Sequence, residues 1–226
     1  MRTGMRVGFM VGAGALLLAA LAEQVSAGVL SGDVNGMSGW SDTRRMDGPM
    51  TWAIIAVDVD YCVYAPGQFE LSFPGQDPTG GTEYVYAYQI FNDLDPHPVT
   101  MPGFNPDYVG RFSVGLDADE GAGNGGYVAG TGAAPSDVDT IGAASTQAGW
   151  DFTDAQMHYP SVSAVLFFTS PNLPELDTAT ASGAYPTNPQ TLPSEMLPSP
   201  SNIPEPATLA LLGTGITLEA GRRRRR

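Results

Sequence analysis

Alternation of apolar and polar side chains is the feature that most constrains the fold of this chain. In residues 51–64, Ile55, Val57 and Val59 share one parity, while Asp58 and Asp60 share the other. A period of two is typical of a half-buried β-strand, so the apolar parity is expected to face a core. The same reasoning predicts strands at residues 68–73, 82–92, 110–117 and 161–169, a shorter one at 150–152, and weaker ones near 126–129 and 179–184.

Turn signals rich in Gly and Pro separate these runs, and no segment between the two termini has a sustained helical period. Parallel strands need helical crossovers, so the pattern favours an all-β fold, an antiparallel Ig-like β-sandwich, over residues 48–184. We expect one core shared by eight residues: Ile55, Val57, Val59, Phe69, Leu71, Phe112, Val114 and Leu166.

The first 27 residues have the order of a secretory signal peptide. Arg2 and Arg6 precede an apolar run at residues 7–21, and residues 25–27 are small enough for a cleavage site. We expect export by the Sec machinery, with the signal helix removed between Ala27 and Gly28. Residues 28–47 are then predicted to be an N-terminal extension of the sandwich.

The charge of the chain limits its partners. All ten basic residues of the 226 are arginines, and only three of them lie between Gly28 and Ile203, against 21 acidic residues. A nucleic-acid binder needs cations that displace counterions from phosphates, so nucleic acid is excluded as a partner. An acidic, lysine-free body suits a soluble extracellular protein, and it can attract divalent cations. The single cysteine excludes an internal disulfide.

The C-terminal part contains two distinct segments. Residues 185–203 are rich in Pro, Ser, Thr and Asn, which predicts an extended linker. The apolar segment at residues 207–220 would be about 21 Å long as a helix, which is short for a stable transmembrane helix. Five arginines, Arg222, Arg223, Arg224, Arg225 and Arg226, follow it and are expected to stop transfer and hold that end in the cytoplasm.

These C-terminal features resemble a known sorting signal. The triplet Pro204, Glu205 and Pro206, the run Ala-Thr-Leu-Ala-Leu-Leu-Gly and the arginine cluster are similar to the PEP-CTERM protein family over residues 204–226. The resemblance implies a substrate of exosortase, a membrane-embedded cysteine transpeptidase that cleaves near the triplet. It also implies transient membrane insertion, and an association with the cell surface, biofilm and exopolysaccharide. The body, at residues 84–92 and 165–171, resembles β-rich passengers of the same family, which implies no activity.

Candidate catalytic groups are sparse. His97 and His158 lie far apart without neighbouring ligand pairs, and Cys62 alternates with aspartates in a strand, where a packing role is expected. Acidic residues are abundant enough for a glycosidase-like pair, but abundance alone does not select one.

Calcium is the cation that the acidic loops would suit best. Asp117, Asp119 and Glu120 precede a glycine-rich stretch, and Asp93 with Asp95 forms a second cluster. Residues 33–36 also begin like a calcium loop. None of these segments completes an EF-hand pattern, so no cofactor is expected. Residues 117–120 can form a solvated acidic loop, and binding of Ca²⁺ there is the alternative.

Tyr84, Tyr86 and Tyr88 share one face of a predicted strand. Such a row can stack on sugar rings, as in carbohydrate-binding modules, or it can pack against a second sheet. The sequence as a whole therefore predicts an exported surface or extracellular-matrix protein without catalytic activity. A carbohydrate-binding module is the alternative, and a hydrolase with paired carboxylates is the third hypothesis.

Overall fold

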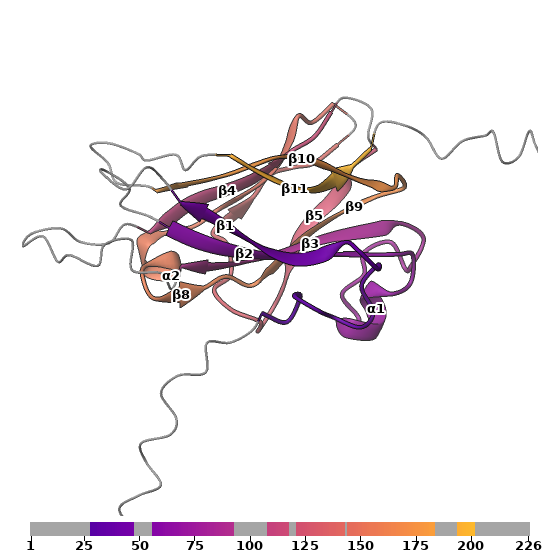
Figure 1. Ribbon diagram of the computed structural model, residues 1–226, viewed down its shortest axis with the longest axis horizontal. Helices are drawn as coiled ribbons and strands as arrows, with labels where there is room; N and C mark the ends of the chain where they lie inside the picture. Colours follow the sequence, from indigo (N-terminus) through magenta and orange to yellow (C-terminus); the bar gives the residue numbers. More distant parts are fainter. Residues whose placement is uncertain are drawn as a thin grey trace, which may run out of the picture.

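The computed structural model describes residues 28–47, 56–92, 108–117, 121–142, 144–183 and 194–201. Two antiparallel sheets and two single-turn helices make up this part of the chain (Figure 1). The elements in order are β1 (Ser41–Asp47), β2 (Ala56–Tyr64), α1 (Phe69–Ser72), β3 (Tyr84–Asn92), β4 (Val109–Gly115), β5 (Gly123–Val128), β6 (Asp137–Val138), β7 (Gln147–Asp151), α2 (Asp154–Met157), β8 (Ser161–Val162), β9 (Val165–Ser170), β10 (Pro174–Gly183) and β11 (Glu195–Pro200).

The first sheet has the order β1-β2-β3-β9-β5, with β8 also paired to β3, and the second has the order β11-β10-β4-β7-β6. All of these strand pairs are antiparallel. In Figure 1, β10 and β11 of the second sheet lie over β1, β2 and β3 of the first. The predicted all-β, antiparallel class is therefore confirmed.

The main core lies between the two sheets. Val57 and Val59 of the first sheet share one cluster of buried side chains with Phe112 and Val114 of the second. The ring centroid of Tyr88 lies 5.8 Å from that of Phe112 and 6.2 Å from that of Trp150, both of which belong to the opposite sheet. These contacts show that the two sheets pack face to face.

A second apolar cluster covers the outer face of the first sheet. Cys62 and Tyr64 of β2 pack there with Leu30 from the N-terminal segment and with Phe69 from α1. Strands β2 and β3 are thus buried on both faces, which explains why β3 is apolar at both parities.

Most of the predicted strands are present, but one is wrong. Residues 69–72 form the helix α1, in which Phe69 is buried while Leu71 is 62% exposed. Leu71 is therefore not a core residue, and Phe69 belongs to the outer cluster. Val57, Val59, Phe112, Val114 and Leu166 do share the main core as expected. Ile55 lies outside the described residues.

The predicted boundaries of the sandwich are too narrow at both ends. Strand β1 comes from the expected extension and pairs with β2 along its whole length, Ser41 opposite Cys62 and Asp47 opposite Ala56. Strand β11 comes from the expected linker and pairs with β10, Pro200 opposite Pro174. It is an edge strand, and its prolines at 198 and 200 share one parity, which leaves the other parity to form the ladder hydrogen bonds.

The Ig-like connectivity stays a prediction. Within the described ranges, neither helix has the length and apolar character needed to span a bilayer. The expected signal helix at residues 1–27 and the expected membrane segment at residues 207–220 both lie outside the described residues.

Candidate functional site

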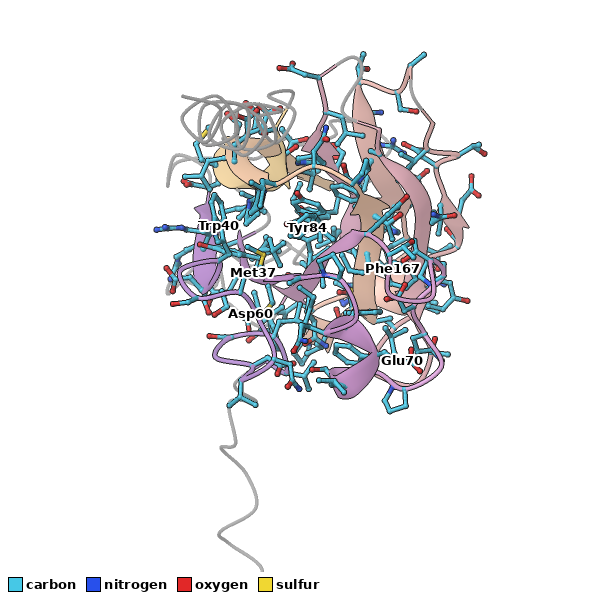
Figure 2. The ribbon with its side chains drawn as sticks, turned by 90° about the vertical axis from the view of Figure 1, so that its right-hand side faces the viewer. Met37, Trp40, Asp60, Glu70, Tyr84 and Phe167 are labelled. Carbon is cyan, nitrogen blue, oxygen red and sulfur yellow. The ribbon has the colours of Figure 1, made fainter. Side chains whose placement is uncertain are left out.

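The tyrosine row of β3 lies inside the molecule. Tyr86 and Tyr88 are fully buried, and the ring of Tyr86 stacks on Phe168 with 5.0 Å between centroids. Their hydroxyls donate to the backbone oxygens of Asn172 and Pro198. Of the two alternatives for this row, packing against the second sheet is therefore confirmed for Tyr86 and Tyr88, and stacking on sugars is excluded for them because solvent does not reach the rings. Tyr84 is half-buried at the end of the same cluster, where Met37 and Trp40 also pack (Figure 2).

A charged cluster joins three segments on the second sheet. Arg111 of β4 lies directly opposite Asp151 of β7, and its Nη1 donates to both carboxylate oxygens at 2.9 Å. Its Nη2 also pairs with Asp139. Gly149 makes room for this arrangement, because a Cβ there would overlap both Arg111 and Asp139. Because Arg111 pairs with both Asp139 and Asp151, these two carboxylates are not free to act as a general acid and base pair.

The N-terminal segment forms the edge of a hollow. A wide-mouthed depression of about 410 Å³ is lined by seven residues: Val29, Ser31, Gly32, Asp33, Asn35, Ser72 and Phe73. Asp33 Oδ1 accepts the backbone N–H of Asn35 at 2.9 Å, and its Oδ2 accepts the hydroxyl of Tyr64 at 2.8 Å. Asn35 in turn donates from Nδ2 to Ser72 at 2.9 Å. The calcium-like start at residues 33–36 is therefore a turn that fastens the segment to β2 and α1.

The electrostatics of Asp33 follow from these contacts. Burial opposes ionisation of the carboxyl, but hydrogen bonds from Ser72, from the Asn35 backbone and from Tyr64 outweigh it and lower the pKa of Asp33. Asp33 is thus an ionised anchor of the N-terminal segment.

Neither Cys62 nor His158 has the surroundings of a catalytic group. The Cys62 side chain is fully buried, and burial raises the pKa of its thiol to about 12, so that the thiolate is absent near neutral pH. His158 is exposed, and its Nδ1 lies 3.0 Å from the backbone oxygen of Tyr159. His97 lies outside the described residues, so its distance from either residue stays untested.

Asp60 is a residue whose position the sequence did not reveal. Strand parity places it on the face opposite Val57 and Val59, where solvent was expected, but it is only 3% exposed. Its Oδ1 accepts the hydroxyl of Thr43 at 2.6 Å. Burial raises the pKa of Asp60, against the lowering effect of Thr43 and of the Ser31 and Gly28 backbones. The sequence did contain one indication that Asp60 is buried, because it alternates in the strand with Cys62 and Tyr64 and so shares a face with them.

The predicted calcium residues are only partly described. Asp117 is exposed just after β4, while Asp93, Asp95, Asp119 and Glu120 lie outside the described residues. Within the part of the chain that is described, no three His, Cys, Asp or Glu side chains gather closely enough to hold a metal ion. Calcium at residues 117–120 stays a prediction.

The sorting and cleavage residues, apart from Gly28, also lie outside the described part of the chain, so the comparisons with known proteins bear on them. Residues 202–226 match the family model of the PEP-CTERM protein-sorting motif, which confirms the resemblance over Pro204, Glu205, Pro206 and the arginine cluster. The chain is thereby marked for export, for recognition by exosortase and for sorting to the cell surface. No curated protein and no solved structure matches the chain.

Proposed function

We propose that the protein is a non-catalytic component of the cell surface or extracellular matrix, delivered by exosortase and associated with exopolysaccharide. The observation that carries this proposal is the sorting motif at residues 202–226, which directly follows an all-β body. The finer Ig-like sandwich is part of the same proposal, since such sandwiches are common among cell-surface domains.

Three features of the described residues support a role without catalysis. The Cys62 thiol is buried and protonated near neutral pH. The carboxylates of Asp139 and Asp151 pair with Arg111, and that of Asp33 accepts hydrogen bonds from Asn35 and Tyr64. These side chains stabilise the fold and are therefore poorly placed to act on a substrate.

The proposed route to the surface has three steps. The Sec machinery exports the chain, and the signal peptide is removed after Ala27. Residues 207–220 then enter the membrane transiently, with Arg222 to Arg226 on the cytoplasmic side. Exosortase cleaves near the triplet at 204–206, where the two prolines favour the extended backbone that a protease cleft binds.

The triplet provides the test of this route. Replacing Pro204, Glu205 and Pro206 by alanine should leave export intact and block removal of the tail. The variant should then collect in the membrane fraction at a larger intact mass, as should the wild type in a host without exosortase. The matched control replaces Pro186, Pro189 and Pro193 by alanine, which changes prolines outside the motif and should be processed normally. Normal processing of the first variant would refute the proposal.

The matrix association needs a separate measurement. The wild-type protein should be retained with the cells of a host that makes exopolysaccharide, and it should be released to the medium by a host that lacks it. Equal retention in both hosts, with tail removal unchanged, would contradict the exopolysaccharide association while leaving exosortase sorting in place.

A further inference from the structure

Asp60 has an unfilled hydrogen-bonding position inside the protein. Its Oδ1 is occupied by Thr43, but Oδ2 is buried and has no hydrogen-bond partner of normal geometry among the described residues (Asp60 is labelled in Figure 2). A buried carboxylate oxygen without a partner is costly, because the charge has lost its hydration and gained little in return. The site therefore lacks a donor, preferably a cationic one.

Gly28 lies directly against this oxygen. A Cβ built on Gly28 would overlap Oδ2 of Asp60 and would lie 2.7 Å from Cζ of Phe91. Because a backbone nitrogen lies about 2.5 Å from its own Cβ position, the nitrogen of Gly28 is within roughly 4.5 Å of Oδ2. Its N–H already stabilises the charge of Asp60 to some extent. A side chain at residue 28 would therefore not fit without a shift of Asp60, and the backbone of Ser31 is the other main-chain group that stabilises this charge.

Gly28 is also the residue that the sequence places immediately after the signal-peptide cleavage site. We propose that removal of the signal peptide completes the Asp60 site, because the new α-ammonium group of Gly28 forms a buried ion pair with the Asp60 carboxylate. This inference rests on the export step of the proposed function. Hydrolysis of the Ala27–Gly28 bond consumes one water, releases Ala27 as a carboxylate and leaves the nitrogen of Gly28 as an amine that takes up a proton.

The ion pair between Gly28 and Asp60 would make removal of the signal peptide affect how the N-terminal segment is held. Before cleavage the nitrogen belongs to a neutral amide with a single N–H, whereas the ammonium group carries a positive charge and three donors. The Asp60 carboxylate therefore has no cationic partner in the precursor and gains one in the mature chain. Processing would tighten the packing of the N-terminal segment on the first sheet.

Among the described residues, the charged neighbours of Asp60 do not supply this cation in another way. Arg45 of β1 shares its face but lies directly opposite Asp58 in the strand register, and Asp42 adds a negative potential. The residues opposite Asp60 on the two neighbouring strands are Thr43 and Gln89, which are neutral. The α-ammonium group is the cation whose position matches the unfilled oxygen.

The absence of lysine makes the amine measurable on its own. In a chain that begins at Gly28, the α-amine is the sole primary amine, since all ten basic residues of the sequence are arginines. Trace acetylation at a series of pH values, read by mass spectrometry of the N-terminal peptide, gives its reactivity and its pKa. We expect a pKa above the usual value of about 7.7–8.0 and at least roughly tenfold slower labelling than in urea.

Two variants control this measurement. Asp60→Asn keeps the shape of the side chain and should return the amine to its ordinary pKa and faster labelling. A chain that begins at Ala27 moves the amine by one residue and should do the same. An ordinary pKa and equal labelling rates in all three folded chains would overturn the proposal.

A thermodynamic cycle gives a second readout. Chains that begin at Gly28 or at Ala27 are each made with and without the Asp60→Asn substitution, and their unfolding equilibria are measured in urea. Asp60→Asn should raise the unfolding constant about tenfold in the chain that begins at Gly28 and lower it in the chain that begins at Ala27. An equal effect in both backgrounds would overturn the ion pair. If the substituted chains fail to fold, the labelling of the two chains that keep Asp60 decides.

N-terminal sequencing of the exported protein separates this inference from the proposed function. A mature chain that starts elsewhere than Gly28 would refute the ion pair and leave exosortase sorting untouched. If instead the variant with alanine at residues 204–206 were processed normally, while the mature chain began at Gly28 with a protected amine, exosortase sorting would be refuted. The ion pair would then still stand.

Discussion

The hydroxyl of Tyr88 donates a hydrogen bond to the carbonyl oxygen of Pro198, and so joins β3 of the first sheet to β11 of the second. Replacing Tyr88 by phenylalanine should lower the free energy of unfolding by about 1 kcal/mol, because the buried carbonyl loses its donor while the ring stays packed. Urea denaturation measures the change. Tyr127→Phe removes a hydroxyl from an exposed ring and should leave stability unchanged. Equal effects of the two changes would contradict this role of Tyr88.

Val57 should be intolerant of charge. It is fully buried between the sheets, so Val57→Asp would place an unpaired carboxylate in the main core and should unfold the domain. Circular dichroism and limited proteolysis would detect the loss of structure. Val34→Asp makes the same chemical change at a residue that is 94% exposed, and it should remain folded. A folded Val57→Asp protein would show that the core is assigned wrongly.

The ion-pair cluster on the second sheet should depend on the planar guanidinium of Arg111. This side chain is 29% exposed and bridges Asp139 and Asp151, so Arg111→Ala should destabilise the protein by about 2 kcal/mol. Arg111→Lys should recover only part of this, because one ammonium nitrogen cannot replace both Nη1, which contacts Asp151, and Nη2, which contacts Asp139. Arg44→Ala, which removes a largely exposed pair with Asp42, should have little effect in the same denaturation experiment.

Asp33 should make the stability of the protein depend on pH in the acid range. Its pKa is lowered in the folded state, so the folded protein releases this proton more readily than the unfolded chain. The stabilisation is therefore complete above the unfolded value of about 3.9, and it is lost as pH falls from there through the folded pKa. Comparing wild type with Asp33→Asn in urea from about pH 7 to pH 3 should show a difference that shrinks only below about pH 4. A difference that is constant with pH would exclude this role of the Asp33 charge.

The strands that the sequence predicted well are those with one clear apolar parity. Val57 and Val59 in β2, and Phe112 and Val114 in β4, face the main core as expected, because the pleat fixes which side chains share a face. The strand predicted at residues 68–73 was wrong for a geometric reason. Phe69 and Phe73 have equal parity in a strand but also share a face of a helix, four residues apart, and so short a window does not separate the two periods.

The other errors come from tertiary contacts that local patterns do not contain. Pro198 and Pro200 made β11 look like a linker, although prolines are accepted at one parity of an edge strand. Asp60 looked solvent-facing, because the N-terminal segment that covers it lies about 30 residues earlier in the chain. The sorting tail, in contrast, was readable from sequence because its recognition depends on a short linear motif.

The position of β11 limits how far the folded body can lie from the triplet at residues 204–206. Ser201, just after β11, is still buried, and Pro204 follows it by three residues. Three fully extended residues span at most about 11 Å, which is roughly the width of one helix with its side chains. An enzyme that grips several residues on each side of the triplet would therefore meet the folded second sheet. Such an enzyme and the pairing of β11 with β10 would then require the same stretch of chain.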